Sequence, residues 1–303
     1  MIVLGAAAFV SLALGVSCWG QPLFRDKLLV AMEAKHLSLV EIGIFGQIRA
    51  IGLLDPVFKP RKLADQSYLM GVSASGERLL IGVQSHDGGY EPKMNDEVDV
   101  TNLNGATLAK IHPFIRGMLS FCAELSPDGQ SVAFGGQFAR FNARSIFGLH
   151  LLEISGNMRT LVKTTEAQTP LSIGWSRDGR TIVYDLDGKV LLYHLDTDSV
   201  SFLTDGSRPT WSADGIWIAY RRPDGTAGLI RPDGTGSKSI LDNVRLGWGL
   251  RWTPDGRYLL YTDAVADAIR VSDTESGEVA TILKSIDGQY TEARLRWVRD
   301  VLR

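Results

Sequence analysis

The sequence predicts an all-β protein, a six-bladed β-propeller of four-stranded antiparallel blades, and three observations support this fold. A short turn signature recurs along the chain, short apolar segments follow each copy, and the chain begins and ends partway through one repeat. A repeat of this length with several strands is typical of propeller blades, each of which needs its neighbours to bury its two faces.

The signature is an aromatic or aliphatic residue followed by Ser or Thr, one or two variable positions and Gly. Five copies occur, at 72–76 (VSASG), 125–129 (LSPDG), 175–179 (WSRDG), 211–215 (WSADG) and 252–256 (WTPDG), and a sixth at 297–300 (WVRD) lacks the Gly. The intervals between successive starting positions scatter around the roughly 40 to 45 residues of a blade. Pro, Asp and Gly in this order favour a tight turn, so each copy predicts a hairpin.

Each hairpin leads into a short apolar strand, predicted at 131–134, 181–184, 217–220 and 258–261. A third strand such as 190–195 and a fourth such as 199–203 complete one period. Four strands per period make a blade, and stacking the blades around an axis covers both faces of each sheet.

The two ends of the chain are predicted to share a blade. Residues 27–32, 37–44 and 48–54 have the pattern of second, third and fourth strands, and 293–297 that of an innermost strand. Joining them removes two exposed sheet edges and closes the ring, with the C-terminal strand completing the N-terminal blade. A seven-bladed or incomplete ring remains an alternative.

Residues 1–20 predict an export signal or a membrane anchor, and residues 24–303 the propeller domain. No charged side chain occurs from Met1 to Phe24, and small residues precede a cleavage position near 17–20. Such a segment is removed on export or, if uncut, could just span a bilayer. Lipid attachment at Cys18 and an apolar helix packed on a cytoplasmic domain are alternatives. The expected location is the periplasm or the cell exterior, with the membrane contacted only through an uncleaved 1–20 segment.

Composition narrows the class of partner. The 303 residues carry a formal net charge of −2, and the basic residues are scattered, so nucleic acid is not an expected partner. Only Cys18 and Cys122 occur, which provides no disulfide framework.

The pattern Trp-Ser-Pro-Asp-Gly followed by an apolar strand that ends in Phe or Tyr, seen best at Trp175, Trp211 and Trp252, resembles the TolB-like, WD-type β-propeller repeat. The resemblance covers most of residues 26–300. It implies an exported propeller that binds a protein or peptide partner of the cell envelope. Family members with an α/β domain before the propeller differ from this sequence, in which about 25 residues, mostly the predicted export segment, precede the first predicted strand.

The sequence shows no catalytic motif, and we expect no cofactor and no metal site. The nearest approach to a G-x-S-x-G nucleophile turn, 71–75, ends in Ser and falls in a predicted hairpin. The five histidines are dispersed, and His150 and His194 fall in third strands, where a strand-surface position is expected. The acidic pairs Asp185/Asp187 and Asp196/Asp198 are expected to be ordinary turn residues, because neither continues as a calcium loop.

Two long insertions between second and third strands, 84–96 and 137–147, are the predicted binding loops. Long loops on a rigid scaffold commonly carry binding residues, and aromatic and arginine side chains commonly anchor partners. The predicted partner-binding residues are Tyr90, Arg140, Phe141 and Arg144; solvated surface loops are the alternative.

The function predicted is therefore a non-catalytic, extracytoplasmic scaffold that binds a protein or peptide. The alternative is an enzyme acting on a small molecule or carbohydrate in the central channel, for which Glu124 and Arg251 are the main inward-facing candidates. Because each precedes a signature residue, they are equally well explained as polar residues at blade junctions.

Overall fold

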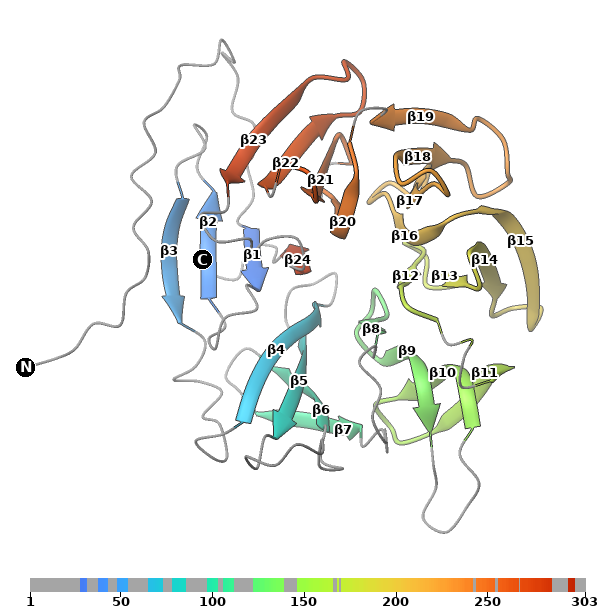
Figure 1. The fold of residues 1–303 in the computed structure, drawn as a ribbon. Helices are drawn as coiled ribbons and strands as arrows, with labels where there is room; N and C mark the ends of the chain where they lie inside the picture. Colours follow the sequence, from blue (N-terminus) through green and yellow to red (C-terminus); the bar gives the residue numbers. More distant parts are fainter. Residues whose placement is uncertain are drawn as a thin grey trace, which may run out of the picture.

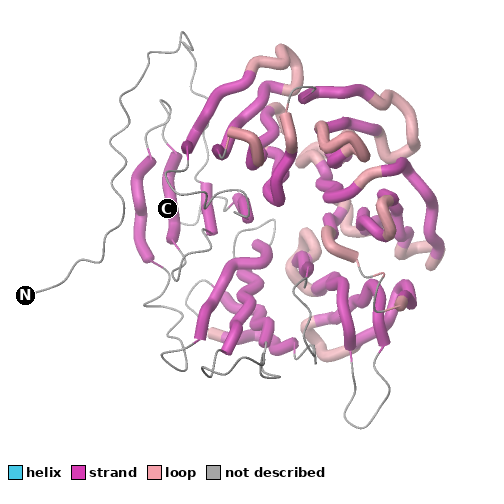
Figure 2. The backbone as a smooth tube through the Cα atoms, viewed as in Figure 1, coloured by secondary structure: helices cyan, strands magenta, loops and turns pink. Residues whose placement is uncertain are grey.

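The computed structural model describes residues 28–31, 38–42, 48–53, 65–72, 78–85, 97–102, 106–111, 122–138, 146–165, 168, 170–241, 244–253, 256–266, 268–284 and 294–297. All of the regular elements among these residues are β-strands (Figure 2). The predicted all-β class is confirmed. No helix among them is long and apolar enough to cross a membrane.

Five antiparallel sheets have four strands each, paired in chain order and arranged around a common centre (Figure 1). The first contains β4 (Asp65–Val72), β5 (Arg78–Ser85), β6 (Glu97–Asn102) and β7 (Thr107–Ile111). The second contains β8 (Cys122–Leu125), β9 (Ser131–Phe138), β10 (Ile146–Glu153) and β11 (Met158–Thr164).

The other three four-stranded sheets follow in the same way. The third contains β12 (Ile173–Trp175), β13 (Thr181–Leu186), β14 (Lys189–His194) and β15 (Ser199–Asp205). The fourth contains β16 (Ser207–Trp211), β17 (Ile218–Arg221), β18 (Ala227–Ile230) and β19 (Lys238–Leu241). The fifth contains β20 (Leu246–Trp252), β21 (Tyr258–Asp263), β22 (Ala268–Asp273) and β23 (Val279–Lys284).

Four strands from the two ends of the chain form two further pairs. Strand β24 (Arg294–Trp297) pairs antiparallel with β1 (Leu28–Ala31), with Trp297 opposite Leu28. Strand β2 (Ser38–Ile42) pairs with β3 (Ile48–Leu53). The predicted pairing of the C-terminal strand with the N-terminal segment is therefore present, whereas a single sixth blade made of all four strands stays a prediction.

One register irregularity recurs at the pairing of third and fourth strands. It lies after Val100, Leu149, Val190, Ala227 and Ile269 in the five four-stranded sheets. The β2–β3 pair has the same irregularity after Leu39. A bulge of this kind bends the strand and increases its twist, so the outer pairs of all these sheets deviate in the same way.

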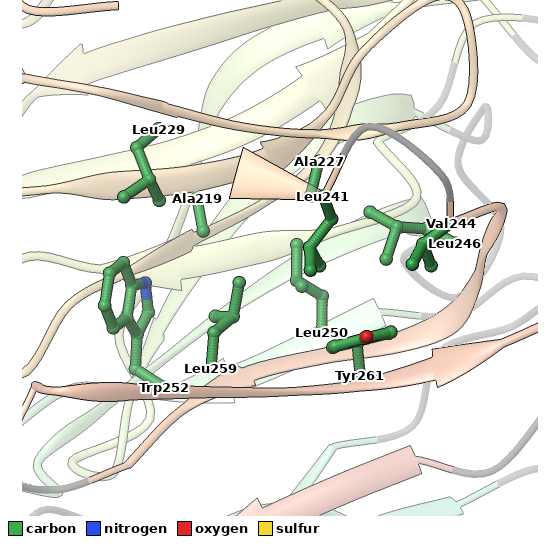
Figure 3. Close-up of a cluster of buried hydrophobic side chains, with 10 residues drawn as sticks. All are labelled: Ala219, Ala227, Leu229, Leu241, Val244, Leu246, Leu250, Trp252, Leu259 and Tyr261. Carbon is green, nitrogen blue, oxygen red and sulfur yellow. The ribbon is translucent and has the colours of Figure 1, made fainter. Parts of the chain in front are cut away.

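The hydrophobic core lies between facing sheets. Alternate side chains of the second strand of each sheet point to its two faces and contribute to the core on both sides. In β13, Ile182 and Tyr184 pack with Ala133 of the preceding sheet, while Val183 packs with Ile218 of the following one. Because successive side chains of a strand point to opposite faces, one apolar strand fills two interfaces. Figure 3 shows the interface of the fourth and fifth sheets, where Leu229, Trp252, Leu259 and Tyr261 come together.

The signature turns have the predicted conformation and an additional hydrogen-bond network. Gly179 has a φ of 72°, a left-handed value that Gly adopts without strain. The Ser176 hydroxyl donates to Asp178 Oδ1 at 2.6 Å and accepts from the Thr181 N–H at 2.9 Å, and Asp178 accepts from the Arg180 N–H at 3.1 Å. The same three bonds recur around Ser126 and Ser212. The Ser and Asp of the signature thus hold the turn together.

Candidate functional site

The four predicted partner-binding residues, Tyr90, Arg140, Phe141 and Arg144, lie outside the described residues. The segments that contain them, 86–96 and 139–145, join the second and third strands of their sheets, as expected. The predicted ends of the insertions are wrong, however. In the β9–β10 pair, Gln137 lies opposite Phe147 and Phe138 opposite Ile146, so these four residues belong to the strands. Strand β5 likewise extends to Ser85. In both sheets the strands keep pairing beyond the apolar run.

Two of the signature tryptophans connect neighbouring sheets. Nε1 of Trp175 donates to the carbonyl oxygen of Glu124 at 3.1 Å, and Nε1 of Trp252 donates to that of Thr210 at 3.3 Å. Both acceptors directly precede the signature residue of the preceding sheet. The buried indole N–H of Trp211, in contrast, has no hydrogen-bond partner among the described residues. The Trp of the signature therefore serves the junction between sheets as well as its own turn.

Glu124 and Arg251 meet across the centre of the arrangement. Nη2 of Arg251 lies 2.7 Å from Oε1 of Glu124, and their side chains are 20% and 18% exposed. Strand β8 contacts β4 and β12, and β20 contacts β16 and β24, so the pair joins strands that are not neighbours (Figure 1). The ion pair thus connects the second and fifth sheets at the centre of the arrangement.

Asp185 is a buried anchor, so the expectation that it is an ordinary turn residue is wrong. It lies within β13, and its oxygens accept from the backbone N–H groups of Leu171 at 2.9 Å, Ser172 at 2.7 Å and Arg208 at 2.9 Å. Burial raises the pKa of Asp185, and the three backbone donors oppose that shift. Its neighbour Asp187 does lie in a turn, with a φ of 52°.

His150 is buried, so its expected position on the strand surface is also wrong. Its ring stacks on Phe134 with centroids 5.0 Å apart, Nδ1 lies 3.0 Å from the Thr160 hydroxyl, and Nε2 lies 3.2 Å from the Gly136 carbonyl. Burial lowers the pKa of His150. His194 is partly buried beside Ser201, at 2.9 Å.

Within the described residues, no group of three or more His, Cys, Asp or Glu side chains is placed to hold a metal ion. Glu124 is paired with Arg251, His150 is buried in the second sheet, and Asp185 accepts hydrogen bonds from three backbone N–H groups. Of these groups, the Glu124–Arg251 ion pair is the one that lies at the centre.

These features, repeated sheets around a centre with a turn signature in each, define a β-propeller. No protein-family model matches the chain, and no curated protein matches it in sequence. Among solved structures it is similar to a protein assigned as TolB from Agrobacterium tumefaciens, with a TM-score of 0.57 and 17% identity over 89% of this chain and 97% of that one. The chain has the TolB-like propeller fold that its signature predicts.

Two further structures have the same fold. TolB from Acinetobacter baumannii matches with a TM-score of 0.62 and 14% identity, over 90% of this chain and 67% of that one. A chain of a nidogen/laminin complex matches with a TM-score of 0.61 and 13% identity, over 90% of this chain and 98% of that one. At these identities the likeness concerns the fold.

Proposed function

We propose that this chain is a non-catalytic, extracytoplasmic propeller that binds a protein or peptide partner of the cell envelope. One observation carries the proposal: the connections between second and third strands at 86–96 and 139–145, with 11 and 7 residues, are longer than the equivalent ones at 187–188 and 222–226, with 2 and 5. Long connections on a rigid scaffold are where propellers and other repeat folds can present a binding surface. Tyr90, Arg140, Phe141 and Arg144 are the proposed anchors.

The scaffold that we propose is a closed ring of six blades over residues 24–303. Its support is the pairing of β24 with β1, the contacts of β24 with both β20 and β4, and the bulge that β2–β3 shares with the other third and fourth strands. In such a ring β24 serves as the innermost strand of the N-terminal blade and covers the edge of β1, and the blades then hold the loops at fixed positions around one axis.

Export through residues 1–20 is part of the same proposal. The apolar, uncharged character of this segment supports it, as does the likeness of the fold to TolB. Mass spectrometry of the N-terminus of the protein isolated from its host decides whether residues 1–20 are removed, retained or lipidated at Cys18. An intact, unmodified N-terminus on a protein recovered from the cytoplasm would contradict export.

Affinity capture from an envelope extract tests the binding function. The full chain is compared with a variant carrying Ala at Tyr90, Arg140, Phe141 and Arg144. A control variant carries Ala at Arg177, Arg180 and Phe202, which are exposed on other parts of the surface. We expect one partner to be retained by the wild type and the control and lost by the loop variant. Equal capture by all three would overturn the site.

A second candidate function is favoured by the ion pair at the centre. An enzyme acting on a small molecule or carbohydrate would use an acidic and a basic group there, and Glu124 and Arg251 are such groups. Binding of small ligands that is abolished by Glu124→Gln, together with an absence of any captured partner, would favour this function over the scaffold.

A further inference from the structure

Arginine side chains gather where the fourth and fifth sheets meet. The cluster consists of Arg208, Arg221 and Arg245. Ser207 pairs with Arg221 in the β16–β17 ladder, which places Arg208 next to the end of β17. The position that a Cβ would take on Gly225 is 3.4 Å from Nη2 of Arg221 and 3.8 Å from Cγ of Arg245. The three side chains therefore originate around one point.

Hydrogen bonds fix the backbone of this cluster. The Leu246 N–H donates to the Gly225 carbonyl at 3.1 Å, and the Ala264 N–H donates to the Arg245 carbonyl at 2.9 Å. Arg208 donates from Nη1 to the carbonyl of Gly247 in β20 and from its backbone N–H to Asp185. The positions of the arginines are thus set by rigid strand ends and short turns, not by long loops.

One carboxylate lies beside the cluster and interacts with one of its members. Asp185 accepts from the backbone N–H groups of Leu171, Ser172 and Arg208, and its charge attracts the Arg208 guanidinium. Asp224, in the exposed turn 222–226, accepts from the N–H and hydroxyl of Thr226. Within the described part of the chain, neither Arg221 nor Arg245 forms an ion pair, and the buried Nε of Arg221 has no hydrogen-bond partner.

The cluster also carries electrostatic and conformational strain. Burial and the charge of Arg221 lower the pKa of Arg208. Arg208 has a φ of 54°, which is left-handed and unfavourable for a residue with a side chain. At the preceding Gly206, a Cβ would lie 2.6 Å from the Arg221 carbonyl oxygen, so the chain passes close to β17 here. Like charges and backbone strain that a fold maintains together are typical of binding sites.

We propose that the Arg208–Arg221–Arg245 cluster binds the carboxylates of an acidic segment of a protein partner. This inference rests on the proposed scaffold function and names the chemistry of its partner. Guanidinium groups present paired N–H donors that match a carboxylate, and the partial burial of Arg208 and Arg221 strengthens such bonds. The net charge of −2 and the scattered basic residues elsewhere do not provide a track for nucleic acid.

The cluster lies at the same end of the sheets as the proposed binding loops. The turn 222–226 joins the second strand to the third, which is the connection that 86–96 and 139–145 make in their own sheets. The signature turn 212–217 lies at the opposite end of β17, since the strands are antiparallel. An acidic residue of a partner could therefore reach the arginines while apolar residues contact the loops.

Fluorescence anisotropy of the full chain with a labelled hexaglutamate peptide tests this proposal, with hexaglutamine as the neutral probe. We expect hexaglutamate alone to bind, and Arg221→Gln and Arg245→Gln each to raise its Kd by about tenfold, the effect of one lost charge-assisted contact. Arg177→Gln removes the same charge from a signature turn and is expected to change the Kd less than about twofold. Arg245 is exposed, so its variant is expected to fold even if Arg221→Gln does not.

An equal loss with Arg177→Gln would show that only net charge matters and would overturn the site. Displacement by inorganic phosphate at matched ionic strength, or equal binding of a hexanucleotide, would overturn the assignment to acidic peptides. If hexaglutamate fails to bind while a partner is captured through the loops, this inference fails and the scaffold function stands. If hexaglutamate binds as expected while no partner is captured, the scaffold function fails instead.

Discussion

The guanidinium of Arg251 and the carboxylate of Glu124 form an ion pair of 2.7 Å between β20 and β8, strands of two sheets that are not neighbours. Two complete sheets lie between them along the chain (Figure 1). This ion pair holds the second and fifth sheets together across the centre. Its contribution to the free energy of unfolding therefore measures how strongly these two sheets are coupled.

A double-mutant cycle with Glu124→Gln and Arg251→Gln measures that contribution. We expect a coupling energy of about 1 kcal/mol in the free energy of urea unfolding, because the pair is largely shielded from water but not fully buried. The control is the exposed pair Arg180–Asp196, at 3.7 Å, for which the coupling should be below about 0.5 kcal/mol. Additive effects of the two central substitutions would mean that the pair does not connect the sheets.

The indole hydrogen bond from Trp175 to the Glu124 carbonyl should stabilise the junction of the second and third sheets. Trp175→Phe removes the N–H and leaves the carbonyl without that donor, whereas Trp211→Phe removes an N–H that has no described partner. We expect Trp175→Phe to lower the free energy of unfolding by about 1 kcal/mol more than Trp211→Phe does. Equal losses for both variants in urea unfolding would assign the role of the Trp to its ring alone.

The carboxylate of Asp178 makes the signature turn sensitive to acid. The Ser176 hydroxyl, chiefly, and the Arg180 N–H lower the pKa of Asp178 in the folded protein. Its contribution to stability is therefore complete above the unfolded pKa of about 4 and is lost as the pH falls through the lower, folded value.

Ser176→Ala removes the largest cause of that shift. We expect this variant to lose about 1 kcal/mol at pH 7, through the two hydrogen bonds of the hydroxyl, and to lose less further stability than the wild type between pH 5 and pH 3. Urea unfolding over this pH range measures both effects, and Asp178→Asn serves as a reference without the carboxylate. An unchanged acid slope in Ser176→Ala would contradict the role of its hydroxyl.

Local chemistry explains which parts of the structure were predictable. Gly179 and the apolar run after it determine a turn and a strand from adjacent residues alone, and the predicted strands 181–184 and 258–261 fall within β13 and β21. The pairing of 294–297 with 28–31 also followed, because each segment has the pattern of strands that the other lacks.

The contacts that surround the candidate site depend on residues far apart in the chain, and there prediction was incomplete. Glu124 and Arg251 were singled out as inward-facing, but their mutual pairing follows from the arrangement of the sheets. Asp185 has the sequence context of a turn residue, and only the backbone of Arg208 in the next sheet reveals it as an anchor. The arginine cluster had no sequence signal beyond single basic residues, because three separate strand ends and loops bring it together.

His150 shows the same limit and leads to a pH-dependent prediction. Its position in a third strand was predictable, but its burial depends on Phe134, Thr160 and Gly136 from the two adjacent strands. Burial lowers the pKa of His150, so the folded protein keeps this side chain neutral where the unfolded chain begins to take up a proton. The unfolded state then binds more protons, and stability must fall as the pH decreases below the unfolded pKa of about 6.5.

We therefore expect the wild-type free energy of unfolding to decrease between pH 7 and pH 5, and His150→Gln to remove part of that slope while retaining a polar group for Thr160. The substitution itself should cost about 1 to 3 kcal/mol at pH 7, because it replaces a buried, stacked and hydrogen-bonded ring. His194→Gln is the matched control, since this histidine is only partly buried. Urea unfolding at pH 5, 6 and 7 distinguishes the cases: if His150→Gln keeps the full wild-type slope, the buried imidazole is not its source.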